Sequence, residues 1–112
     1  MDTITPRELE AMFSDRIDMV LVNVMSEDAF ERARIPRSQN LPASNEDFVE
    51  SVEQLAGSKH GTVVLYGASD DLAESERAAR RLAEAGFTDV AYLEDGIEGW
   101  IESGLEVESG DV

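Results

Sequence analysis

Hydrophobic residues along the chain occur in short continuous runs, separated by segments in which apolar residues recur at helical spacing. Runs at residues 19–24, 62–66 and 89–93 are each five or six residues long and almost entirely apolar. Such runs are typical of strands that are covered on both faces. A shorter extended segment is expected at residues 39–42, where the sequence reads Gln-Asn-Leu-Pro.

The segments between the runs have recognisable helix ends. Thr5 is a good N-cap, Pro6 suits the first helical position, and Glu8 completes a capping box. Further helices are expected at residues 26–33, 45–55 and 75–85 and around Trp100, with Ser26 and Asn45 as N-caps and Gly57, Gly86 and Gly104 as stops. Strands and helices thus alternate, which predicts an α/β fold with right-handed crossovers and a parallel sheet covered by helices on both faces.

The length of 112 residues predicts a single domain over residues 1–112, with residues 1–3 and 106–112 expected to be frayed. No apolar run approaches the ~20 residues that a membrane span needs, and the N-terminus lacks a basic segment followed by an apolar one. We therefore expect a cytoplasmic protein that does not enter a membrane. The chain has no cysteine, which excludes a thiolate nucleophile, a disulfide and a Cys-based metal site.

Charge is the most unusual property of the sequence. There are 25 acidic residues against 9 basic ones, and the net charge is −16. The acidic residues are spread over every segment, so no basic patch is expected that could bind nucleic acid or an anionic membrane. Dense acid with a single lysine resembles the composition of proteins from halophiles, in which molar salt screens the repulsion between carboxylates.

Three segments resemble the single-domain rhodanese (thiosulfate sulfurtransferase) pattern. They are I-P-R-S-Q-N-L-P at residues 35–42, Tyr66-Gly67 at the end of a strand, and the G-F…V…L…G-I-E-G-W ending at residues 86–100. The resemblance covers nearly the whole chain. It implies a rhodanese-like fold with a central, mostly parallel five-stranded sheet.

The same resemblance implies that a catalytic cysteine, which carries sulfur as a persulfide, belongs at position 67. This chain has Gly67 there. Further departures lie at the positions that support the cysteine in the family: Asn23, Met25, Ala29, Ala33-Arg34 and Asp95. Because the nucleophile and its supporting groups are missing together, the sequence indicates a pseudoenzyme.

The loop that would hold the nucleophile is the candidate site. It comprises Gly67, Ala68, Ser69, Asp70, Asp71, Leu72, Ala73 and Glu74, with Arg34 and Asp95 as its rim. Its three acidic residues are interpreted as charges that complement the dipole of the following helix, with Asp71 or Ser75 as N-cap. They would repel thiosulfate or phosphate. A cysteine-phosphatase function fails because the loop has neither the cysteine nor a closing arginine.

Other chemistry remains open but has weaker support. Asp70, Asp71 and Glu74 could form a cation site, and Glu94 with Asp95 could act as an acid–base pair. A serine nucleophile at Ser69 or Ser75 has no histidine base nearby, since His60 is expected in an exposed turn. Trp100 is interpreted as core packing.

We therefore predict a non-catalytic binding or regulatory module that needs no cofactor or metal and whose partner is another protein. The alternative is a sulfur-handling protein that acts with a partner's cysteine.

Overall fold

The computed structural model describes residues 2–110, and these form a central sheet with helices between the strands. In chain order the elements are β1 (Asp2–Ile4), α1 (Pro6–Ser14), β2 (Met19–Asn23), α2 (Glu27–Arg32), β3 (Gln39–Asn40), α3 (Phe48–Ala56), β4 (Thr62–Tyr66), α4 (Leu72–Glu84), β5 (Val90–Leu93) and α5 (Gly96–Glu102). All strand pairs are parallel, and the strand order is β1-β5-β4-β2-β3. The predicted α/β class and five-stranded sheet are confirmed, and the sheet is entirely parallel.

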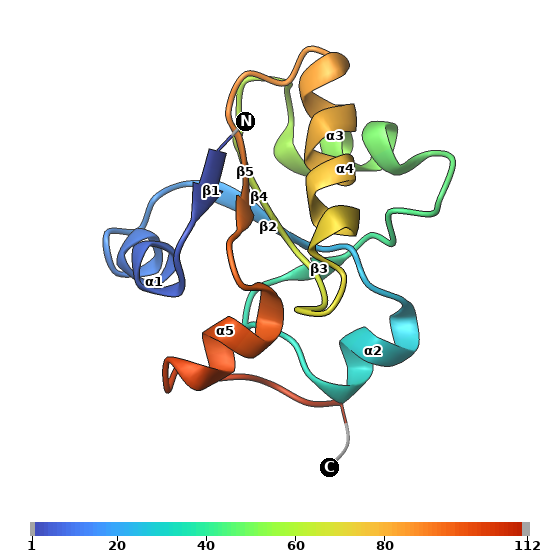
Figure 1. Ribbon diagram of the computed structural model, residues 1–112. Coiled ribbons are helices and arrows are strands. Elements are labelled where there is room, and N and C mark those ends of the chain that lie inside the picture. The colour runs from blue at the N-terminus through green and yellow to red at the C-terminus, as the bar shows by residue number, and fades with distance from the viewer. Residues whose placement is uncertain (1, 111–112) are drawn as a thin grey trace.

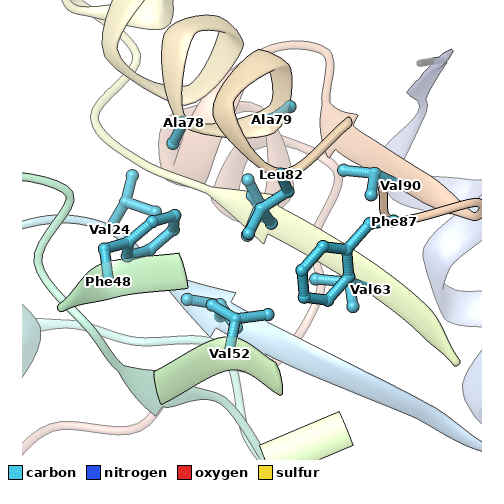
Figure 2. Close-up of a cluster of buried hydrophobic side chains, with 11 residues drawn as sticks. Val24, Phe48, Val52, Val63, Ala78, Ala79, Leu82, Phe87 and Val90 are labelled. Carbon is cyan, nitrogen blue, oxygen red and sulfur yellow. The ribbon is translucent and has the colours of Figure 1, made fainter. Parts of the chain in front are cut away.

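Helices cover both faces of the sheet (Figure 1), as the sequence predicts. On one face, α3 and α4 pack against the valines and leucines of β2, β4 and β5. Figure 2 shows Phe48 and Val52 of α3 and Ala78, Ala79 and Leu82 of α4 in this cluster. On the other face, α1 and α5 cover a second cluster that includes Leu9, Leu21, Tyr66, Ile97 and Trp100. Trp100 is 3% exposed, in agreement with its interpretation as core packing.

The predicted capping box of α1 is confirmed. The Thr5 hydroxyl accepts the Glu8 amide at 3.1 Å, and the Glu8 carboxylate accepts the Thr5 amide at 2.9 Å. The predicted starts of two other helices are wrong. Asn45 lies in a turn before α3 and is not its N-cap, because the Phe48 amide bonds the Asn45 carbonyl in a three-residue turn. The α4 helix begins at Leu72, so Ser75 lies inside it.

Both ends of the described chain differ from the expected frayed segments. Asp2–Ile4 forms an edge strand paired with Ala91, Tyr92 and Leu93 of β5. Near the other end, the Glu108 backbone exchanges hydrogen bonds of 2.8 and 2.9 Å with Arg34. Residues 1, 111 and 112, which the same expectation covers, lie outside the described residues.

No helix within the described part of the chain is long and apolar enough to cross a membrane.

Candidate functional site

The candidate loop leaves the carboxyl end of β4 and leads into α4. At the same edge of the sheet, β2 ends at Asn23, which is in register with Tyr66 of β4. Ligand sites of open parallel sheets lie outside the carboxyl ends of the strands. The loop therefore occupies the position in the fold where chemistry or binding is expected.

Gly67 is buried, and its surroundings leave little room for a side chain. A Cβ placed there would lie 2.9 Å from the Ser75 hydroxyl oxygen and 3.2 Å from Cγ2 of Val24. The Gly67 carbonyl accepts the Ile97 amide at 3.0 Å, which ties the loop to α5. Position 67 is thus a closed point in the packing, and no nucleophile is presented there.

Two buried polar groups at this edge of the sheet have no hydrogen-bond partner among the described residues. They are the Ser75 hydroxyl, which lies next to Gly67 on the first turn of α4, and the side-chain nitrogen of Asn23, whose side chain lies near the Tyr66 hydroxyl. Both residues are 0% exposed. Since a buried polar group without a partner costs about 1–3 kcal/mol, this part of the molecule is not optimised for stability.

The side-chain oxygen of Asn23 stabilises the part of the site that lies between β2 and β3. This Oδ1 atom accepts the Met25 amide at 2.9 Å, and the Asn40 side-chain nitrogen reaches the Met25 carbonyl at 2.9 Å. The family that the sequence resembles has an aspartate at this position. Here the neutral Asn23 amide accepts the Met25 amide, so the site lacks a buried negative charge at this point.

Tyr66, next to Gly67, is completely buried and fully hydrogen-bonded. Its hydroxyl accepts the Ile35 amide at 3.0 Å and lies 2.8 Å from the Ser38 hydroxyl. Burial raises the pKa of Tyr66 above its ordinary value, and this effect exceeds the lowering by Ser38 and its other neighbours. The phenol therefore stays neutral and serves as a structural bridge to the segment before β3. The sequence analysis did not predict this role of Ser38. The only signal for it in the sequence is the I-P-R-S segment at residues 35–38.

The middle of the loop is fixed to the start of α5. The Ser69 hydroxyl donates to the Asp95 carbonyl at 2.5 Å and accepts the Glu98 amide at 2.9 Å. Gly96 has a φ of +65°, and a Cβ there would lie 2.9 Å from the Gly67 carbonyl and the Ser69 backbone. Only glycine fits this close approach. Ser69 is thus a structural bridge, and its hydroxyl is not free to act as a nucleophile.

The outer surface of the loop is acidic. The side chains of Asp70 and Asp71 are exposed, and Glu74 is half-buried. Burial raises the pKa of Glu74; Asp71 raises it further, and Arg77 opposes the shift. Asp71 occupies the N-cap position of α4, but its side chain makes no capping hydrogen bond. Asp70 and Asp71 thus face solvent, and the Asp71 side chain is not used in capping.

The other candidate residues lie as follows. Asp95 is exposed beside the loop, whereas Arg34 stacks on Phe30 at 5.0 Å and lies 3.9 Å from Glu108. His60 is exposed at the opposite end of β4, with its ring 3.3 Å from the Thr88 hydroxyl. Within residues 2–110, no three histidine or acidic side chains converge to hold a metal ion, so the cation interpretation of the loop gains no support.

A family model of the rhodanese-like domain matches residues 5–103. The chain belongs to the rhodanese-like domain family. The sequence-based resemblance is thereby confirmed, and this rhodanese-like domain contains no cysteine. The nucleophile of the family is therefore absent. No curated protein matches the chain.

Solved structures show the same fold. A thiosulfate sulfurtransferase from Pseudomonas aeruginosa is 26% identical with a TM-score of 0.87; the alignment covers 97% of this chain and 20% of that protein. This domain therefore spans a fifth of that structure. The rhodanese-like domain of an Anabaena protein is 21% identical over 97% of this chain and 80% of that one, with a TM-score of 0.82. A rhodanese-related protein from Thermoplasma volcanium is 21% identical over 96% and 98%, with a TM-score of 0.78.

Proposed function

We propose that this rhodanese-like domain is a non-catalytic binding module that contacts a protein partner through the loop at residues 67–74. The observation that carries the proposal is the state of position 67. In a chain without cysteine, Gly67 stands at the nucleophile position, and the Ser75 hydroxyl and Val24 close the space around it. Sulfur transfer by the domain alone needs a thiolate that the chain cannot supply.

The charge of the loop surface favours a protein partner over a small anion. Asp70, Asp71 and Asp95 are exposed at this edge of the sheet and would repel an anionic sulfur donor. A partner that presents lysine or arginine side chains would complement them and would associate faster for that reason. The loop itself is held by Ser69 and Gly96, so its surface is pre-organised for docking.

The first test measures transfer of sulfur from thiosulfate to cyanide by the purified domain. We expect no turnover above the buffer rate, and turnover would overturn the proposal. A Gly67→Cys variant is expected to gain no persulfide, because the groups that support the family's cysteine are replaced at Asn23, Met25 and Ala29.

The second test captures partners from the native extract in high-salt buffer, as the acidic composition recommends. The bait is the domain and its Asp70→Asn/Asp71→Asn variant. The matched control is Glu50→Gln/Glu53→Gln, which removes the same charge from the exposed surface of α3. We expect a protein that the wild type and the control retain and the loop variant loses. Equal retention by all three would contradict the loop as the binding surface. Sulfur transfer that appears only when the captured protein is added would instead favour the alternative, in which the partner supplies the cysteine.

A further inference from the structure

Two arginines occupy backbone conformations that normally require glycine. Arg16 has a φ of +56° and Arg37 a φ of +73°, and among the described residues no other non-glycine residue has a positive φ. An L-residue in this region is strained, and such strain is concentrated at functional sites. The question is what these two side chains do that glycine cannot do.

Arg16 ends the first helix. The Ile17 amide bonds the Met12 carbonyl at 3.0 Å, and the Arg16 amide bonds the Phe13 carbonyl at 3.1 Å. This is the Schellman pattern, in which the left-handed residue after the C-cap is usually glycine. The motif needs only the backbone of residue 16, so the arginine side chain is not required to form it.

Arg37 occupies the corresponding position of a tight turn. The Ser38 amide bonds the Ile35 carbonyl at 3.2 Å, with Pro36 and Arg37 as the central residues. Proline followed by a residue of positive φ is the signature of a type II turn, whose third residue is usually glycine. Here too the backbone fold explains the conformation but not the choice of arginine.

Both arginines line the same hollow on the surface, which has a volume of about 360 Å³. Its apolar wall is formed by Phe13, Ile17, Met19 and Leu21. Ile17 is 47% exposed, which is high for a large apolar side chain. The guanidinium of Arg37 lies 5.4 Å from the centre of the Phe13 ring, and this cation–π contact holds it over the apolar wall.

The hollow is locally cationic in a strongly acidic chain. It has two arginines and one acidic residue, Asp18. Among the described residues, neither Arg16 nor Arg37 forms an ion pair, whereas Arg7, Arg34 and Arg80 do. In a protein with a net charge of −16, unpaired cations that converge on one surface indicate a ligand that brings negative charge.

The hollow also adjoins an open edge of the sheet. β3 pairs only with Val22 and Asn23, whereas β2 pairs with β4 along its whole length from Met19. The Asn23 carbonyl accepts the Leu41 amide on the β3 side, and alternate residues of a strand point their backbone groups to the same side. The pairing of Val22 with Gln39 uses the Leu21 carbonyl, so among the described residues only the backbone groups of Met19 and the amide of Leu21 face an edge with no strand beside it.

We propose that this edge binds an extended acidic peptide segment of a partner protein as an additional strand. The peptide backbone pairs with both backbone groups of Met19 and with the amide of Leu21. An apolar side chain enters the hollow beside Phe13, and acidic side chains two positions before and after it contact Arg16 and Arg37. An unpaired edge supplies the affinity of such strand addition, and alternate side chains supply its specificity. This surface is separate from the loop at residues 67–74.

The test uses a defined peptide pool, acetyl-Thr-Glu-Thr-Xaa-Thr-Glu-Thr-amide, in which Xaa is Leu, Ile or Phe. Titration into ¹⁵N-labelled protein at fixed ionic strength is expected to shift the amide signals of Met19, Leu21 and Arg37. A pool with glutamine in place of glutamate should bind about fivefold more weakly, as expected for two exposed charge contacts. A pool with proline in place of the two central threonines should not bind, because proline removes the backbone donors that pair with the edge.

Two protein variants separate binding from folding. Arg16→Gln/Arg37→Gln should lower the affinity for the glutamate pool about fivefold, and Arg32→Gln, an exposed arginine of α2 at the other end of β2, should not. Arg16→Gly/Arg37→Gly removes both side chains while relieving the backbone, so it should weaken binding without lowering the melting temperature.

Several results would overturn the proposal. The first is no shift of the Leu21 amide signal with about 1 mM peptide, a concentration that marks the weak end of specific binding. The second is equal affinity of the wild type and the arginine variants for the glutamate pool. The third is a set of shifts confined to other surfaces. Shifts at Leu21 that depend on protein concentration and not on peptide would assign the edge to a second copy of the chain. Asp70→Asn/Asp71→Asn should leave peptide binding unchanged, which distinguishes failure here from failure of the loop proposal.

Discussion

Tyr66 and Gly67 are neighbours at the end of β4, yet the polar groups around them differ. The Tyr66 hydroxyl is buried with two partners, the Ile35 amide and the Ser38 hydroxyl. Beside Gly67, the Ser75 hydroxyl is buried with none among the described residues. The first arrangement joins β4 to the segment before β3 and is complete by itself. The second leaves one buried hydroxyl without a partner beside a residue that has no side chain.

The two arrangements separate contacts that the fold itself needs from groups that it does not need. Strand register, the Tyr66 bridge and the attachment of the loop to α5 are all present, so the loop is held in place without a nucleophile. The unpaired Ser75 hydroxyl beside Gly67 forms none of these contacts.

The attachment of the loop to α5 should be the most sensitive point. A Gly96→Ala substitution places a Cβ 2.9 Å from three backbone atoms of Gly67 and Ser69, at a φ of +65°. We expect a loss of about 3 kcal/mol in the free energy of unfolding, from left-handed strain together with backbone displacement. Chemical denaturation measures it.

Gly104→Ala is the matched control, because Gly104 has a φ of +79° but no atom within 4 Å of an added Cβ. It should cost only the left-handed strain, about 1 kcal/mol. Equal losses for the two variants would show that the close approach of α5 to the loop is not important.

The Tyr66 bridge should have the next largest effect. Tyr66→Phe keeps the ring but leaves the buried Ile35 amide without an acceptor, and we expect a loss of about 2 kcal/mol. Tyr92→Phe is the control, since the Tyr92 hydroxyl has no partner within residues 2–110 and its removal should change stability by less than about 0.5 kcal/mol. If Tyr66→Phe is as mild as its control, the bridge is not part of the framework.

The sequence predicts the framework well because each part has a local signal. The capping box at Thr5, the continuous apolar runs and the glycine after α3 depend on neighbouring residues and were found in the structure. The edge strand β1 has no such signal, since three residues of mixed polarity become a strand only because β5 lies beside them. The α4 helix extends to Leu72 for a similar reason, as the loop before it is fixed by α5.

Only part of the candidate site can be predicted from the sequence. Gly67 and the acidic loop follow from their place in the motif, but the contact between Gly67 and Ser75 depends on how α4 packs against the end of β4. The convergence of Arg16 and Arg37 is equally hidden, because they are far apart in sequence and meet only across the α1–β2 side of the sheet. Spacing along the chain does not report such contacts.

The smallest effects on stability are expected at Gly67 and Ser75, where a buried hydroxyl has no partner among the described residues. Ser75→Ala removes a buried hydroxyl without a partner, so it should be neutral or stabilising by up to about 1 kcal/mol. Gly67→Ala should cost about 1–2 kcal/mol, because its Cβ meets that hydroxyl at 2.9 Å. Gly61→Ala is the control; its Cβ would make only ordinary contacts of 3.4 Å or more.

The double variant decides whether the two positions act on each other. If the Ser75 hydroxyl is what closes the space, Gly67→Ala should cost about 1 kcal/mol less in the Ser75→Ala background, and the cycle should be non-additive by that amount. Additivity within about 0.3 kcal/mol would mean that Val24, the other close neighbour, limits the site. A clear loss of stability in Ser75→Ala alone would show that the hydroxyl has a bound partner in solution, and the side of β4 around Gly67 would then be occupied and not empty.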